Sequence, residues 1–195
     1  MSTESSYINY LEVLEMPEDC KSGEAIRAYK KKMKDLVIEI ARVEITEERR
    51  STFLLEMARL NAAYYILRDK DLREKYLADR AQVMQLEEEW HATVEKNPDS
   101  EDADRLRRSY DSVLRHFLST YMEELMLEAG RDKECVEASH WDAAHERLAT
   151  RVLRHYRQQL YREIHERLPY YEVTQPKINW DERKQVVAEL LKVGA

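Results

Sequence analysis

Apolar side chains recur at steps of three and four residues along most of the chain, which is the period of an amphipathic helix. Two such stripes in the first half comprise Ile26, Tyr29, Met33, Leu36, Val37 and Ile40, and then Phe53, Met57, Leu60, Tyr64 and Leu67. Ser22 and Thr46 precede the stripes and are typical helix N-caps. The pattern predicts helices from these two residues, a short helix before Pro17, and another from about Asp71 towards Trp90.

The helical pattern breaks at Asn97-Pro98-Asp99-Ser100, because proline disfavours the helical conformation in the residue before it, and we place a boundary between sub-structures near there. A wide apolar stripe then runs from Leu106 to Met126, with Gly130 as a stop signal. The sequence Ser139-His140-Trp141-Asp142 has the form of a capping box and opens a helix that Pro169 ends. A strand-like stretch lies between Pro169 and Pro176, and a short helix is expected after Asn179.

Composition supports an all-α fold. The 195 residues include only 3 Gly and 4 Pro, whereas β proteins need many turn residues to join their strands. With 43% hydrophobic and 36% charged residues, the chain is expected to be soluble and globular. We predict an all-α fold with a boundary near residue 80, between an N-terminal domain (1–80) and a C-terminal helical bundle (81–195) with a short terminal extension.

Charge and hydropathy exclude several classes of partner. The net charge of −7 is opposite to the electrostatic footprint of a nucleic-acid-binding protein. No apolar run approaches the roughly 18 residues of a membrane helix, and the first residues lack the features of a signal peptide. The two cysteines lie far apart and fit reduced thiols. We therefore expect a cytoplasmic protein that binds neither nucleic acid nor membrane.

Motifs for catalysis or metal binding are not found in the sequence. Three glycines cannot build a phosphate-binding loop, and no nucleophile elbow or His-Glu-x-x-His helix occurs. Cys135, His140, His145 and Glu146 cluster in sequence, and thiolate with imidazole is zinc-ligand chemistry. However, the two histidines are five residues apart and would face different sides of a helix. We expect no enzymatic activity, no cofactor and no metal.

Three segments of the first 80 residues form a series of motifs in a fixed order. They are Tyr10-Leu-Glu-Val-Leu-Glu-Met-Pro17, Ala28-Tyr29-Lys30-Lys31, and Leu60-Asn-Ala-Ala-Tyr-Tyr-Ile-Leu-Arg-Asp69 followed by Arg73 and Tyr76. This series resembles a J-domain, the four-helix module of co-chaperones that work with DnaK-type chaperones. The resemblance implies that the two long helices form an antiparallel pair. It also implies that Lys30, Lys31 and Lys34 could still dock a DnaK-type chaperone, whereas the plainer interpretation is a solvated helix face.

The chain departs from that family at the loop between the two helices. Val37-Ile38-Glu39 occupies the place of His-Pro-Asp, the tripeptide with which J-domains stimulate the chaperone's ATPase. Proline would stop the helix, whereas Val37 and Ile38 continue its apolar pattern. We therefore expect a J-like scaffold that has lost the stimulatory tripeptide.

The second half is expected to carry the binding specificity. Its layout is similar to the C-terminal three-helix bundle of J-type co-chaperones of iron–sulfur cluster assembly. The stripe from Leu106 to Met126 is wider than a two-layer packing needs. Its second row is expected to face a protein partner or to be covered by the final helix; the partner-facing residues would be Phe117, Tyr121, Met122 and Met126.

Together these observations favour a non-enzymatic adaptor in which a J-like domain is joined to a partner-binding bundle. One alternative is a co-chaperone that recruits a DnaK-type chaperone to a client or to an iron–sulfur scaffold. Another is a structural subunit of a larger assembly.

Overall fold

The computed structural model describes residues 9–42 and 46–167, and every regular element in these ranges is a helix. The helices are α1 (Tyr10–Val13), α2 (Ser22–Arg42), α3 (Glu47–Leu67), α4 (Lys70–Lys96), α5 (Glu101–Ser119), α6 (Leu125–Arg131), α7 (Lys133–Ser139) and α8 (Ala143–Arg167). A π-helical segment, η1 (Thr120–Glu124), joins α5 to α6. The all-α prediction is confirmed. The strand-like stretch and the helix expected after Asn179 lie outside the described residues.

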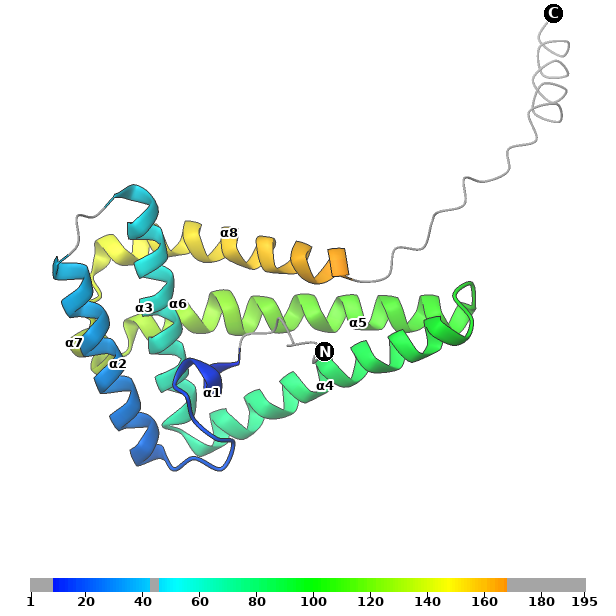
Figure 1. The fold of residues 1–195 in the computed structure, drawn as a ribbon, viewed down its shortest axis with the longest axis horizontal. Helices are drawn as coiled ribbons and strands as arrows, with labels where there is room; N and C mark the ends of the chain where they lie inside the picture. Colours follow the sequence, from blue (N-terminus) through cyan, green and yellow to red (C-terminus); the bar gives the residue numbers. More distant parts are fainter. Residues whose placement is uncertain (1–8, 43–45, 168–195) are drawn as a thin grey trace, which may run out of the picture. The chain divides into compact units, whose positions relative to one another are not determined.

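Helices α2 and α3 lie side by side as the predicted antiparallel pair (Figure 1). The rings of Tyr29 and Tyr64 stack with their centroids 4.3 Å apart, and the Tyr29 hydroxyl donates to Asn61 Oδ1 at 2.8 Å. Thr46 caps α3 as predicted, because its side chain accepts a hydrogen bond from a backbone amide of the first turn. Ser22 is the first residue of α2 rather than its N-cap.

Helix α3 is the centre of the core and contacts α1, α2, α4, α6 and α7. Its buried residues are Leu54, Met57, Ala58, Leu60, Asn61, Ala62, Ala63, Tyr64, Ile66 and Leu67. The polar member, Asn61, accepts from Tyr29 and donates from Nδ2 to Ser139 Oγ at 3.3 Å. An unpaired buried amide would cost about 1–3 kcal/mol, so these hydrogen bonds hold α2, α3 and α7 together.

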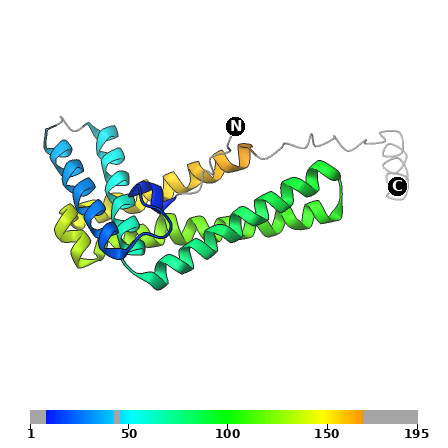
Figure 2. The same cartoon turned by 60° about the horizontal axis from the view of Figure 1, so that its bottom comes forward.

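Helices α4 and α5 form a second antiparallel pair that turns at the predicted break, residues 97–100 (Figure 2). Ser100 caps α5 by accepting from the Ala103 amide at 3.1 Å. Between the two helices, the rings of Trp90 and Tyr110 lie parallel with their centroids 6.2 Å apart.

The wide apolar stripe of α5, η1 and α6 is buried within the chain. The rings of Tyr121 and Tyr76 pack in a T-shaped arrangement with their centroids 5.2 Å apart, and the centroid of the Tyr10 ring lies 5.3 Å from that of Tyr76. The four residues predicted to face a partner, Phe117, Tyr121, Met122 and Met126, are at most 6% exposed. The expectation of an exposed partner surface there is therefore corrected: the chain's own helices cover the second row.

Helix α7 is an element that the sequence pattern did not predict. Asp132 caps it by accepting from the Glu134 and Cys135 amides, and His140 ends it in a left-handed conformation with φ of 56°. Because Ser139 belongs to α7, it cannot open the next helix as the predicted capping box requires. Asp142, not Ser139, caps α8 by accepting from the Ala144 and His145 amides.

The chain divides into two compact units, residues 1–165 and residues 166–195. The boundary predicted near residue 80 lies inside α4, and α3 from one side of that boundary packs against α6 from the other.

Candidate protein-interaction surface on helix α2

Helix α2 separates its lysines from its buried side. Ala25, Tyr29, Met33 and Leu36 point into the core, whereas Lys30, Lys31 and Lys34 are exposed. The neighbouring Lys32 instead donates to Glu15 at 2.7 Å, and this hydrogen bond lowers the pKa of Glu15. The structure therefore brings the three predicted lysines together on the solvent side of α2.

Residues 37–39, which stand in place of His-Pro-Asp, continue α2 without a turn. Val37 and Ile38 are half-buried and Glu39 is exposed. The helix runs on to Arg42, so the prediction that these residues extend it is confirmed. The two apolar side chains have become part of a helix face.

That face lines a groove of 630 Å³ between α2 and α7. Its α2 side is mostly apolar, with two of the exposed lysines at the edge, and its α7 side carries two carboxylates. The lining residues are Ile26, Tyr29, Lys30, Met33, Lys34, Val37, Ile38, Tyr64, Glu134, Glu137, Ala138 and His140. Apolar surface bordered by charges of both signs is suited to binding a protein segment.

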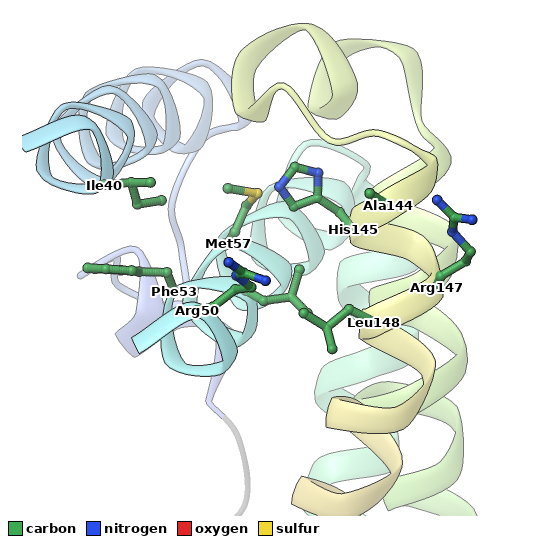
Figure 3. Close-up of a pocket in the computed structure, with 9 residues that line it drawn as sticks. Ile40, Arg50, Phe53, Met57, Ala144, His145, Arg147 and Leu148 are labelled. Atoms are coloured by element: carbon green, nitrogen blue, oxygen red, sulfur yellow. The ribbon is translucent and has the colours of Figure 1, made fainter. Parts of the chain in front are cut away.

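A second cavity, of 480 Å³, begins at Ile40, where α2 approaches α3 and the start of α8. It is lined by Ile40, Arg50, Phe53, Leu54, Met57, Ala144, His145, Arg147 and Leu148. In Figure 3, His145 and Leu148 point from α8 towards α3, whereas Arg147 points to the other side of α8. The C-terminal half of α2 thus contributes to both cavities, to the second one through Ile40.

The α7 wall of the groove is fixed by a polar cluster at the end of α3. Arg68 donates to both Asp132 oxygens, at 3.0 and 2.6 Å, and to Glu134 at 3.3 Å. Burial by itself would raise the pKa of Asp132, but hydrogen bonds from Arg68 and the Cys135 amide bring it below the ordinary value of 3.8. Tyr64 donates its hydroxyl to Glu134. Glu134 is therefore held towards α3, and Glu137 is the more accessible carboxylate.

The four residues weighed as zinc ligands do not converge. Cys135 is buried in the core beside the Asn61 carbonyl, and burial raises the pKa of its thiol to about 12. His140 is exposed at the end of α7, His145 pairs with Asp142, and Glu146 pairs with Arg131. Among the residues that the structure describes, no group of three or more His, Cys, Asp or Glu side chains is placed to hold a metal ion.

The sequence reasoning missed the α7 side of the groove, with Glu134, Glu137 and His140. A helix of seven residues is too short to show a periodic apolar stripe. The signal that could have revealed this helix is Asp132. Its carboxylate can accept hydrogen bonds from the amides two and three residues later, those of Glu134 and Cys135, as an N-cap does.

Comparisons with protein-family models, with curated proteins and with solved structures found no match to this chain. The J-domain resemblance therefore stands on the residues quoted for it alone. In the part of the chain that the structure describes, no helix has the length and apolar character needed to cross a membrane.

Proposed function

We propose that the chain is a non-enzymatic adaptor that binds another protein through the C-terminal half of α2 and does not stimulate a DnaK-type ATPase. The observation that carries this proposal is the unbroken course of α2 through Val37, Ile38 and Glu39. The site at which a J-domain presents a stimulatory turn is here a helical surface: Val37 and Ile38 line one cavity, and the following Ile40 lines a second.

This geometry supports binding rather than activation. Apolar side chains of a partner can enter the two cavities. Such desolvated apolar anchors supply most of the binding energy of a protein interface. Lys30 and Lys34 border the α7 groove and attract acidic groups of the partner.

A second candidate function is that of a co-chaperone that recruits a DnaK-type chaperone without stimulating it. The exposed lysines of α2 favour this candidate, because the J-domain resemblance implies that they face such a chaperone. Under this alternative, Lys30→Glu with Lys34→Glu abolishes chaperone binding. The matched control, Lys75→Glu with Arg108→Glu, changes exposed cations elsewhere and leaves binding unchanged.

The lack of activation is tested in a single-turnover ATPase assay with a purified DnaK-type chaperone. We expect the hydrolysis rate to stay at the chaperone's basal value when the chain is added. Acceleration comparable to that of an ordinary J-protein would contradict the proposal.

The binding surface is tested by photo-crosslinking from position 137, since Glu137 is exposed and lines the groove between α2 and α7. A photoreactive residue at position 137 is expected to crosslink a partner that the same residue at position 88, an exposed glutamate site on α4, does not. The partner is then purified, and its affinity is measured for the chain and for Ile38→Asp. Equal affinity for both chains would place the interaction elsewhere.

A further inference from the structure

A cavity of 370 Å³ between α5 and α8 has a lining unlike that of the α2 surface. It is lined by Arg115, Leu118, Arg157, Gln158, Tyr161 and Arg162. Three of these six residues are arginines, and none of the described residues that line the cavity is a carboxylate, although the whole chain has a net charge of −7. The lining is therefore complementary to an anion.

Two of the arginines are held in place by carboxylates that are not among the lining residues. Arg115 donates from Nε to Asp111 at 2.8 Å, and Arg157 lies with its Nε 3.1 Å from Glu123. An arginine held through Nε is pre-oriented, and terminal nitrogens that make no other contact with the described residues remain available to bind oxygen atoms: Nη1 of Arg115 and both terminal nitrogens of Arg157. Arg162 is exposed and makes no ion pair with the residues that the structure describes.

The aromatic ring of Tyr161 completes the cavity. Its hydroxyl accepts from Arg115 Nη2 at 2.5 Å and donates to Asp111. The Arg115 guanidinium also lies over the ring, 4.6 Å from its centroid. Tyr161 is therefore fixed beside the cations, and its half-buried ring offers apolar surface to a group attached to the anion.

Carboxylates close to the cavity repel an anion, but the arginines around them are more numerous. Asp111 is engaged by Arg115 and Tyr161, and Glu123 is shared by Arg157 and Arg154, whose Nε lies 3.4 Å away. Three arginines thus engage the two carboxylates, and Arg162 adds a fourth cation that neither carboxylate contacts. Glu163 lies next to Arg162 in sequence and accepts from Gln159.

We infer that this cavity binds the phosphate group of a phosphate monoester through Arg115, Arg157 and Arg162. A phosphate monoester carries up to two charges and three terminal oxygens, which match several arginine forks better than a carboxylate does. The organic part of the ester lies against the ring of Tyr161. None of these residues belongs to the α2 surface, so the site does not depend on the proposed adaptor function.

Calorimetric titration of the full chain with phenyl phosphate at constant ionic strength tests the site. We expect phenyl phosphate to bind more tightly than benzenesulfonate, which has the same ring but a single charge. Arg162→Gln is expected to weaken phenyl phosphate binding at least about tenfold, because it removes a charge-assisted contact. Arg107→Gln, an exposed arginine of α5 outside the cavity, is the matched control and leaves the affinity unchanged.

The source of the phosphate is distinguished by a peptide containing phosphothreonine. Tighter binding of this peptide than of phenyl phosphate identifies a phosphorylated partner side chain; weaker or equal binding identifies a small phosphate ester. Both outcomes support the site if they depend on Arg162. The inference is overturned if Arg162→Gln binds phenyl phosphate as well as the unaltered chain, if benzenesulfonate binds equally, or if single-stranded DNA, a phosphodiester, binds as tightly.

Discussion

At the residue scale, Gly130 occupies a position that requires glycine, but not for the reason that its place in the sequence suggested. Its sequence position suggested a helix stop, but it lies inside α6 and has no positive φ. A Cβ atom there would lie 2.8 Å from Cε2 of the buried Trp141. Glycine is needed because an indole ring packs directly on the backbone, a contact between distant residues that local sequence does not reveal.

We therefore predict that Gly130→Ala destabilises the chain by about 1–3 kcal/mol, the usual cost of overpacking a core. Gly23→Ala is the control, because a Cβ at residue 23 of α2 meets nothing within 4 Å. Removing glycine's conformational freedom there is expected to stabilise the chain by about 0.4–1 kcal/mol. Urea unfolding of both variants measures the difference; a stabilising Gly130→Ala would show that Trp141 does not pack there.

Asp132 shows a second residue-scale effect, the dependence of stability on pH. Its pKa is lower in the folded chain than the ordinary value, so its ionised form contributes stability that is complete above the unfolded pKa. That contribution is lost as the pH falls through the folded pKa. Asp132→Asn removes the charge that Arg68 binds but keeps an N-cap residue for α7.

We expect Asp132→Asn to lower the free energy of unfolding at pH 7 by about 1 kcal/mol or more, since the contact with Arg68 is bidentate and largely buried. The difference from the unaltered chain should shrink below about pH 4. Asp69→Asn is the control, because Asp69 caps α4 in the same way but has no arginine contact among the described residues. A difference independent of pH would contradict the role of the charge.

At the element scale, the long helices could be predicted from the sequence because their apolar periodicity extends over several turns. Thr46 and the break at residues 97–100 were found by their local chemistry. Helix α7 was missed because its stability depends on Asn61 and Arg68 of a distant helix. One wall of the candidate site was therefore missed as well. The sequence did identify residues of the other wall, namely Lys30, Lys34, Val37 and Ile38.

Replacing Val37-Ile38-Glu39 by His-Pro-Asp tests the continuity of α2. Proline at position 38 removes a helical hydrogen bond and collides with the preceding turn, which costs about 3 kcal/mol or more. We expect lower helicity by circular dichroism, lower stability in urea, and no gain in stimulation of a DnaK-type ATPase. The control, Val37→His with Glu39→Asp, keeps the helix and is expected to stay close to the unaltered chain in helicity. Stimulation by the tripeptide variant would show that a J-type loop geometry survives.

At the scale of the whole molecule, the sequence could specify helices with apolar faces but not which faces meet. The second apolar row of α5 and η1 was compatible with a partner or with the chain itself. Burial is decided by contacts such as that of the Tyr10 hydroxyl with the Tyr121 carbonyl, 111 residues apart. Such pairings carry no local signal, so the class of fold could be predicted and its interior could not.

These long-range contacts lead to a prediction about truncation. A chain of residues 1–80 loses α6 and α7, which cover α3, and exposes Tyr10, Tyr64 and Asn61 to water. We expect this fragment to lack a cooperative urea transition, because the apolar surface that remains buried cannot offset the conformational entropy of folding. Residues 1–167 retain the described contacts and are expected to unfold cooperatively. A cooperative transition of the 1–80 fragment, with a midpoint near that of the 1–167 chain, would show that the J-like helices fold independently and that α7 is only attached to them.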